Sequence, residues 1–159
     1  MRRYLVISDS HGDVGAVYRA LAAQPEAEAV LHLGDGAADL TAVSSAFPHL
    51  AFYQVRGNGD FASDAAGIPY AREECLGGKR FFLTHGHLYG VKSDPLRVIY
   101  AARERGADVL LYGHTHLPLT DYEDGLYILN PGSLRAGGTY GVVDLSDAGV
   151  VLNIIGVRL

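Results

Sequence analysis

The chain has 159 residues, of which 48% are hydrophobic and 19% charged, and its formal net charge is −5. A chain of this length can bury about 70% of its unfolded surface, so we expect a single domain over residues 1–159. The negative charge argues against a protein that binds nucleic-acid backbones, which would be basic. Cys75 is the sole cysteine, which excludes an internal disulfide and a structural zinc site built from thiolates.

Two arginines precede the apolar run Tyr4–Ile7, an arrangement that can resemble a signal peptide. The run is too short for that role, and no apolar run elsewhere in the chain approaches the length of a membrane span. We therefore expect a cytoplasmic protein with no membrane partner.

The first third of the chain alternates short apolar runs with helical patterns. The runs Tyr4–Ile7, Ala29–Leu33 and Leu50–Val55 are mostly apolar rather than alternating, which is typical of strands covered on both faces. Apolar residues recur at helical spacing in Asp13–Ala23, whose first residue can serve as N-cap, and in Ala37–Phe47. This β-α-β-α-β order predicts an α/β fold that begins with a parallel sheet and right-handed crossovers.

The rest of the chain predicts hairpins around one helix. Small and polar residues make Phe61–Gly67 an expected mobile loop. Glycine-containing turns predict three antiparallel pairs, which are Ile68–Leu76 with Lys79–Leu83, Leu119–Tyr122 with Leu126–Leu129, and Gly138–Leu145 with Val150–Val157. A helix is expected over Pro95–Arg105, capped by Asp94 and stopped by Gly106, and the strand Val109–Tyr112 follows it. The back half should therefore be mostly antiparallel.

A pair of histidines, His114 and His116, directly follows the strand Val109–Tyr112 in the motif Gly113-His114-Thr115-His116. The period-two geometry of a strand would point both side chains the same way. Neutral imidazole is a favoured metal ligand, so the pair suits one ion. Taken alone, the pair is weak evidence, and two polar histidines in a loop are the simpler interpretation.

Similar polar residues follow other predicted strands. Five strands end in glycine-containing loops, which carry Asp9 and His11, then Asp35, then Asn58, then His85 and His87, and then His114 and His116. Sites in open α/β sheets form outside the carboxyl ends of the strands, so these side chains should converge. They are too many for one tetrahedral ion and suit two ions bridged by a carboxylate, about 3.5–4 Å apart. His32 and His49 do not fit the pattern and are expected to be structural.

The series Asp9-x-His11, Gly34-Asp35, Gly57-Asn58-x-Asp60, His85-Gly86-His87 and Gly113-His114-x-His116 resembles the calcineurin-like metallophosphoesterase superfamily. It is most similar to the small single-domain YfcE-type phosphodiesterase branch, and the resemblance covers essentially the whole chain. It implies a four-layer α/β/β/α sandwich with mixed sheets, the N-terminal half parallel and the C-terminal half antiparallel. It also implies a di-metal site at the carboxyl ends of the strands.

The resemblance further implies a division of the ligands. The first ion would take Asp9, His11 and His116, the second would take Asn58, His85 and His114, and Asp35 would bridge them. The expected catalytic residues are Asp9, His11, Asp35, Asn58 and His87. For His87, orienting a ligand, facing the substrate and a purely structural role stay open. Imidazole and carboxylate ligands without thiolate suit Mn²⁺, our first choice, and also Fe²⁺, Co²⁺, Ni²⁺ and Zn²⁺.

The expected reaction is hydrolysis of a small phosphodiester by a hydroxide that bridges the two ions. Ser8, Ser10 and Ser133 lie near the motifs without an evident base, so no protein nucleophile is expected. Protonation of the leaving group is left open between His11, His87 and bulk water. Asp60 could orient a ligand or stabilise its loop, and Arg56 could contact phosphate, although a solvated arginine is the simpler interpretation.

Two alternatives stay open. Many larger family members have histidine directly after the asparagine, where this chain has Gly59, and this departure weighs against a phosphomonoesterase or nucleotidase. A Vps29-like scaffold without catalysis departs from the pattern at the bridging aspartate and at the asparagine ligand. This chain retains both, as Asp35 and Asn58, which favours an enzyme. The branch resemblance also suggests a homodimer or homotetramer, and no stable nucleic-acid binding is expected.

Overall fold

Two five-stranded sheets form the centre of the protein. The computed structural model describes residues 1–158, so residue 159 of the expected domain lies outside the described residues. The first sheet has the order β10-β9-β1-β2-β3, and the second has the order β4-β5-β6-β8-β7. The first sheet contains β1 (Arg2–Ile7), β2 (Ala27–His32), β3 (Ala51–Gln54), β9 (Thr139–Ser146) and β10 (Gly149–Gly156). The second contains β4 (Ala71–Leu76), β5 (Lys79–Thr84), β6 (Val109–Tyr112), β7 (Leu119–Glu123) and β8 (Leu126–Asn130).

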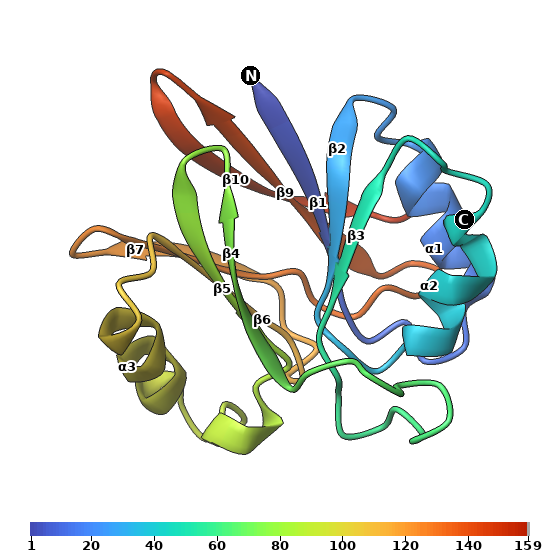
Figure 1. Cartoon of the computed structure of the whole chain (residues 1–159), viewed down its shortest axis with the longest axis horizontal. Helices are drawn as coiled ribbons and strands as arrows, with labels where there is room; N and C mark the ends of the chain where they lie inside the picture. Colours follow the sequence, from blue (N-terminus) through green and yellow to red (C-terminus); the bar gives the residue numbers. More distant parts are fainter. Residues whose placement is uncertain (159) are drawn as a thin grey trace.

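Helices cover the outer faces of both sheets. The helices α1 (Val14–Ala22) and α2 (Ala37–Ser44) lie against the first sheet, and α3 (Leu96–Glu104) lies against the second, on the opposite side of the molecule (Figure 1). The order of layers is therefore helix, sheet, sheet, helix, as the resemblance implies. None of the helices in residues 1–158 is long and apolar enough to cross a membrane.

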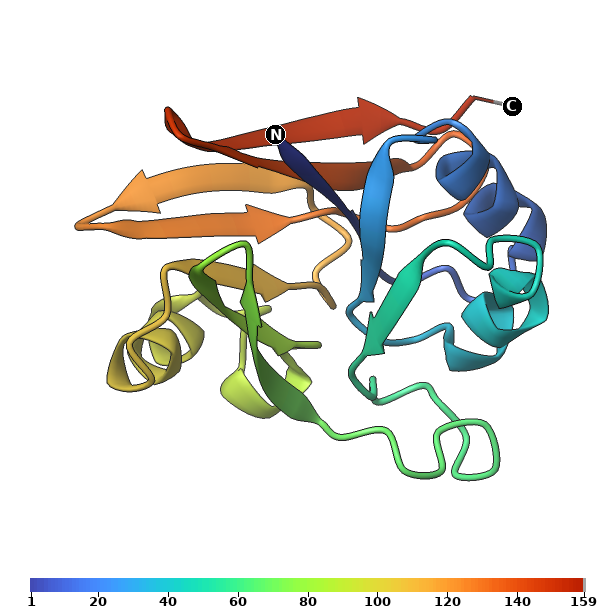
Figure 2. The same cartoon turned by 45° about the horizontal axis from the view of Figure 1, so that its top comes forward.

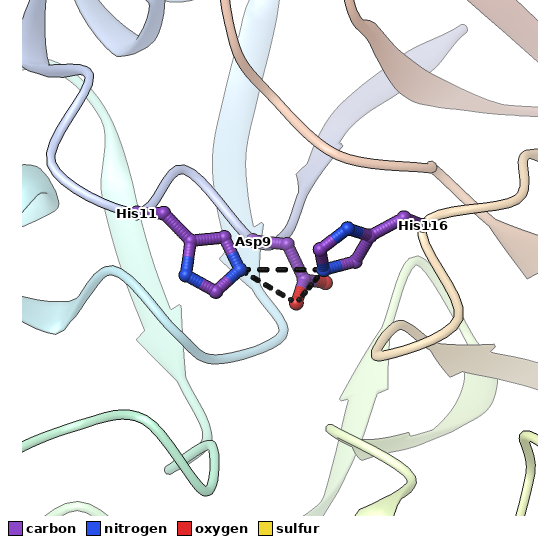
Figure 3. A group of neighbouring side chains, drawn as sticks. All are labelled: Asp9, His11 and His116. Atoms are coloured by element: carbon purple, nitrogen blue, oxygen red, sulfur yellow. Dashed lines mark hydrogen bonds and ion pairs between the residues drawn. The ribbon is translucent and has the colours of Figure 1, made fainter.

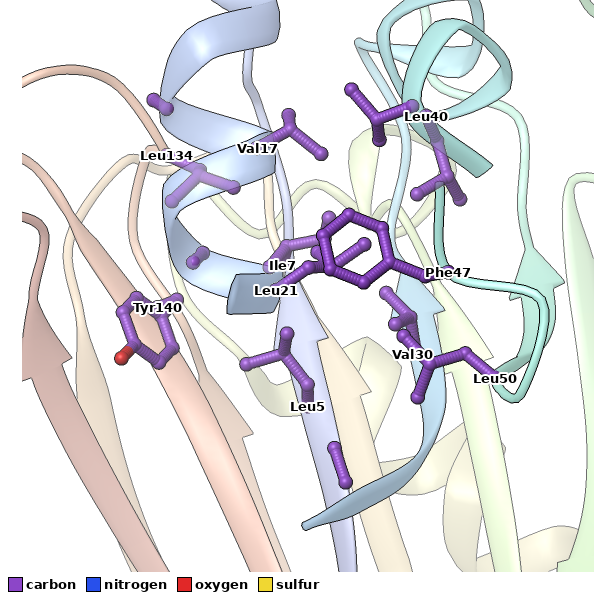
Figure 4. Close-up of a cluster of buried hydrophobic side chains, with 14 of the residues drawn as sticks. Leu5, Ile7, Val17, Leu21, Val30, Leu40, Phe47, Leu50, Leu134 and Tyr140 are labelled. Carbon is purple, nitrogen blue, oxygen red and sulfur yellow. The ribbon is translucent and has the colours of Figure 1, made fainter. Parts of the chain in front are cut away.

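The alternation of side chains in β1 explains why its apolar run is continuous. Leu5 and Ile7 pack with Val17 and Leu21 of α1 in the core under the helices (Figure 4). Tyr4 and Val6 belong to the other core, between the two sheets. Because successive side chains of a strand point to opposite faces, a strand covered on both faces must be apolar at every position.

The pairing of strands confirms the predicted parallel opening and corrects the second half. The pairs β1–β2 and β2–β3 are parallel, and the three predicted hairpins are antiparallel. However, β6 runs parallel to both β5 and β8, so the expectation of an antiparallel C-terminal half is wrong for these two pairs. The helix α3 crosses over between β5 and β6, which lets both strands run in the same direction. The carboxyl ends of β5 and β6 therefore lie at the same edge.

The structure confirms one predicted helix cap and moves two predicted helix ends. The predicted cap of α1 is confirmed, because Asp13 Oδ1 accepts a hydrogen bond from Ala16 N at 2.9 Å. The helix α2 ends before Phe47, which packs into the core from the following turn. The N-cap of α3 is Pro95, one residue later than predicted. A residue before proline is disfavoured in the helical region, so Asp94 stays outside the helix and accepts from Leu96 N at 2.9 Å.

The connection between β3 and β4 contains the expected loop Phe61–Gly67. It extends beyond the ends of the strands (Figure 2). Its mobility stays a prediction.

Candidate metal centre

Three predicted ligands form a first cluster beyond the carboxyl ends of β1 and β6 (Figure 3). His116 Nε2 lies 3.1 Å from Asp9 Oδ1, and His11 Nε2 lies 3.4 Å from the same oxygen. The two imidazole nitrogens are 3.3 Å apart. Ligands about 2.0–2.2 Å from one ion lie roughly 3–3.5 Å from each other, so this spacing suits a shared divalent ion.

A second cluster joins β2, β5 and β6 through Asp35, His85 and His114. His85 Nε2 lies 3.3 Å from Asp35 Oδ2 and 3.1 Å from His114 Nδ1. His85 is buried, and its Nδ1 lies 2.7 Å from the carbonyl oxygen of Leu33. In the neutral ring, donation from Nδ1 to this carbonyl leaves Nε2 unprotonated and free to bind a metal.

One oxygen of Asp35 faces both clusters. Oδ2 lies 3.3 Å from His85 Nε2 in the second cluster and 3.8 Å from His11 Nε2 in the first. Oδ1 is taken by the N–H group of Gly59, which donates to it at 2.6 Å. These contacts orient the carboxylate between the two clusters, as a bridging ligand requires.

Backbone conformations at the ligands are unusual. Among residues 1–158, six non-glycine residues have a positive φ, namely Asp9, His11, Asp35, His114, His116 and Asp124. Five of the six are predicted metal ligands, with φ between 45° and 69°. Non-glycine residues in this region cost about 1–3 kcal/mol each, and such conformations concentrate at functional sites. The fold thus stabilises uncommon backbone conformations at five of the predicted ligands, which supports a functional site at this edge.

The histidine motif after β6 differs from the strand geometry predicted for it. His114 and His116 both have a positive φ, so they do not continue the strand, and their rings do not share one centre. His114 lies in the second cluster and His116 in the first. The period-two expectation is therefore wrong, because the chain leaves the extended conformation after Tyr112. Gly113 is required there, because an added Cβ would overlap the Ser8 hydroxyl.

Asp60 connects the loops that follow β2 and β3. Its carboxylate accepts four backbone hydrogen bonds of 2.8–3.0 Å, from the N–H groups of Asp35, Gly36, Ala37 and Gly57. Two of these donors, Gly36 and Ala37, begin helix α2, so Asp60 also satisfies N–H groups that lack partners within the helix. Of the two roles considered from sequence, the hydrogen bonds support stabilisation of the loop.

Asp39 has a similar role that the sequence did not reveal. Its Oδ2 accepts hydrogen bonds from Ser10 Oγ at 2.7 Å and from Gly12 N at 2.8 Å, on either side of His11. An aspartate in the first turn of a helix is usually a solvated charge that favours the helix dipole, so the sequence carries no signal for this contact. Asp39 is nevertheless buried and supports the loop that holds His11.

Within the second cluster the ionisation of Asp35 and His114 favours cation binding, whereas His85 must lose its proton when a metal binds. Burial opposes the charged forms of both partners, but the contact between Asp35 and His85 outweighs it. The pKa of Asp35 is lowered to about 2, and the pKa of His85 is raised by the hydrogen bond to Asp35 and the charge of Asp9. Burial and the charge of His85 lower the pKa of His114. The carboxylate is therefore charged and His114 tends to be neutral, as ligands must be.

The other candidate residues lie around the clusters. Asn58 is exposed between Gly57 and Gly59, in the loop that contacts Asp35, and its role as a ligand stays a prediction. His87 begins a short 3₁₀ turn, with its ring centroid 5.4 Å from that of His85. Its Nδ1 is buried and has no hydrogen-bond partner within the described residues.

Further polar residues have structural contacts. The guanidinium carbon of Arg56 lies 5.3 Å from the centre of the Tyr70 ring. His32 is buried, and its Nδ1 accepts a hydrogen bond from Gly34 N at 3.0 Å. Each of the three serines near the motifs donates a hydrogen bond from its hydroxyl group. Ser8 donates to the Asp9 carboxylate, Ser10 to the Asp39 carboxylate and Ser133 to the backbone carbonyl of Asp9.

The sequence and structure match known phosphoesterases. Residues 2–148 match the calcineurin-like phosphoesterase superfamily domain. The chain is 38% identical over 137 residues to the probable metallophosphoesterase YsnB of Bacillus subtilis, covering 82% of this chain and 74% of YsnB. It is 37% identical over 100 residues to the phosphodiesterase YfcE of Escherichia coli K12, covering 57% of this chain but only 50% of YfcE.

Solved structures share the fold. A predicted phosphoesterase from Streptococcus pneumoniae TIGR4 is 30% identical, with a TM-score of 0.80 over 98% of this chain and 89% of that chain. Vps29 from Entamoeba histolytica, in a structure with Zn²⁺, has a TM-score of 0.74 over 98% of this chain and 99% of that chain. Its identity of 21% supports similarity of fold alone.

Proposed function

This chain belongs to the calcineurin-like phosphoesterase superfamily, and we propose that it is a phosphodiesterase that uses two divalent metal ions, with Mn²⁺ as the first candidate. The observation that carries the proposal is the pair of His/Asp clusters with Asp35 Oδ2 between them. Similarity to YsnB and YfcE supports phosphoester chemistry. The preference for diesters is our inference.

The donor set fits the ions that such a reaction needs. The clusters contain imidazole nitrogens and carboxylate oxygens without a thiolate, a combination that suits divalent transition metals. Asp9, His11 and His116 would hold one ion, and His85, His114 and Asn58 the other, with Asp35 shared. Ions bound there supply an activated water and neutralise charge on the phosphoryl oxygens.

The residues of the chain contribute mainly by fixing the ligands in position. Asp9 is fully buried, with Oδ2 bound by the Ser8 hydroxyl and by His114 N, so Oδ1 alone faces the cluster. The contact of Leu33 with His85 and the contacts of Asp60 with the Asp35 loop act in the same way. Preorganised ligands and dipoles lower the barrier because they need not rearrange during reaction. His11, His87 and bulk water remain the alternatives for protonating the leaving group.

The test compares a diester with a monoester of the same chromophore. Purified protein loaded with Mn²⁺ should hydrolyse bis(p-nitrophenyl) phosphate faster than p-nitrophenyl phosphate. The variants Asn58→Ala and His85→Ala should lose most of this activity, whereas His49→Ala, which changes an exposed histidine outside the clusters, should retain it. Faster hydrolysis of the monoester would instead assign the chain to the phosphomonoesterases or nucleotidases. Wild-type protein that binds two ions and turns over neither ester would be a scaffold of the Vps29 kind.

A further inference from the structure

A pocket of about 470 Å³ lies beside the first metal cluster. Small-molecule sites commonly have volumes of about 300–1,000 Å³, so the pocket has a suitable size for a substrate arm. Its lining includes His11 and Asp35 of the clusters, and it extends over the beginning of α2 to Phe61, Asp64 and Arg135. A phosphate group at the metal centre could therefore place one of its substituents directly in this pocket.

Phe61 lines this pocket from a turn that contains backbone hydrogen bonds. The residue is 76% exposed. Its carbonyl accepts hydrogen bonds from Asp64 N and Ala65 N, both at 3.0 Å, and Ala65 is buried. The preceding residue, Asp60, is held by four backbone hydrogen bonds. An exposed aromatic ring offers a flat apolar face on which a planar group can stack.

Two charged side chains in the lining are available to a ligand. Asp64 and Arg135 are exposed, and neither makes an ion pair or a side-chain hydrogen bond within residues 1–158. The carboxylates of Asp39 and Asp60 in the same lining already accept hydrogen bonds from neighbouring loops. The pocket thus provides one aromatic face, one free acceptor group and one free donor group.

This combination matches a nucleobase better than a quaternary ammonium group or a plain alkyl group. A base has a flat π face on which an aromatic ring can stack. Its N–H groups can donate hydrogen bonds to a carboxylate, and its ring nitrogens or carbonyl oxygens can accept them from a guanidinium. A quaternary ammonium group would suit Phe61 and Asp64 but would place a second cation beside Arg135. A plain alkyl group would use neither charge.

We propose that this pocket binds the nucleoside arm of the substrate, with the base stacked on Phe61 and its polar edge towards Asp64 and Arg135. The inference rests on the proposed function, because it requires the phosphate to lie at the metal clusters. It names the substrate class as phosphodiesters that contain a nucleotide.

Binding of a product-like nucleotide tests the proposal without turnover. Protein loaded with Mn²⁺ is titrated in a calorimeter with guanosine 5′-monophosphate, ribose 5-phosphate and phosphocholine. We expect the nucleotide to bind at least about fivefold more tightly than ribose 5-phosphate, because stacking on an aromatic residue contributes about this much or more. Phe61→Ala should remove most of that preference and leave ribose 5-phosphate binding unchanged. Tyr100→Ala, which removes an exposed ring on α3, should change neither.

Three outcomes would overturn the assignment of the pocket. These are equal binding of the nucleotide and ribose 5-phosphate, tighter binding of phosphocholine, and equal weakening of all three ligands by Phe61→Ala. Turnover of methyl p-nitrophenyl phosphate, which has no nucleoside arm, separates this failure from that of the proposed function. Turnover without a base preference refutes only the pocket, whereas no turnover by protein with two bound ions refutes the phosphodiesterase.

Discussion

Replacing Asp60 with asparagine tests whether hydrogen bonds from outside the clusters hold the metal centre together. Each carboxylate oxygen of Asp60 accepts two backbone hydrogen bonds, Oδ1 from Gly36 and Ala37, and Oδ2 from Asp35 and Gly57. Asparagine keeps one acceptor oxygen and turns the other into an amide donor that faces two N–H groups. The variant therefore loses two of the four hydrogen bonds, whichever way the amide is oriented.

The expected loss of stability follows from this count. Hydrogen bonds to charged groups contribute about 1.5–3 kcal/mol each. Asp60 is partly exposed, so water can replace some of the loss, and we use the lower value. Two bonds then give about 3 kcal/mol, which corresponds to a decrease of about 6–12 °C in the Tm of a protein of this size. The Tm is measured without metal, because bound ions would add their own stabilisation.

The same change should weaken metal binding, because Asp35 lies in one of the loops that Asp60 joins. Loss of a group that orients ligands typically costs 10–100-fold in metal affinity or activity, and we expect an effect of about this size. Asp147→Asn is the matched control, because it makes the same substitution in the exposed turn between β9 and β10. If Asp60→Asn matched the control both in Tm and in Mn²⁺ affinity measured by titration, Asp60 would not hold the metal centre together.

The clusters and the buried histidine give further predictions. The double variant His114→Ala/His116→Ala should lose both ions, whereas His85→Ala/His114→Ala should lose one, because these two histidines share a cluster. Metal analysis after dialysis checks this, and equal loss in both variants would contradict the division of ligands. Burial lowers the pKa of His32 from 6.5 to about 4. At a pH between these two pKa values, the unfolded chain therefore binds a proton at His32 that the folded chain does not. Stability from His32 is thus fully present above pH 6.5 and falls by about 3 kcal/mol as the pH drops to 4. His32→Gln should reduce the slope of unfolding free energy against pH in this window, and a slope equal to that of the exposed control His49→Gln would contradict the prediction.

Much of the fold was predictable because its signals are local. The strands β1, β2 and β6 are marked by apolar runs, the hairpin of β4 and β5 by two glycines, and the cap of α1 by Asp13. The parallel pairing of β6 with β5 and β8 was not predicted. Pairing of strands depends on contacts between distant segments, and an apolar run carries no information about the direction of its neighbour.

The candidate ligands were also visible in the sequence, because metal chemistry requires particular side chains and these follow the ends of strands. Their supports were not visible. Asp39 and Asp60 hold the loops through contacts with backbone N–H groups, which any sequence provides. An aspartate that accepts such bonds looks the same in the sequence as one in solvent.

The sequence by itself thus determined the elements, the kinds of ligand atom and the edge at which they gather, since all three follow from residue type and position along a strand. The family resemblance implied which ligands share a centre, but the contacts between them exist only in the tertiary structure. His116 meets Asp9 across 107 positions of sequence, and His85 meets Asp35 between two different sheets. Only the packed sheets stabilise the positive φ angles at five ligands, because an isolated loop would relax to the more favourable conformations of L-residues.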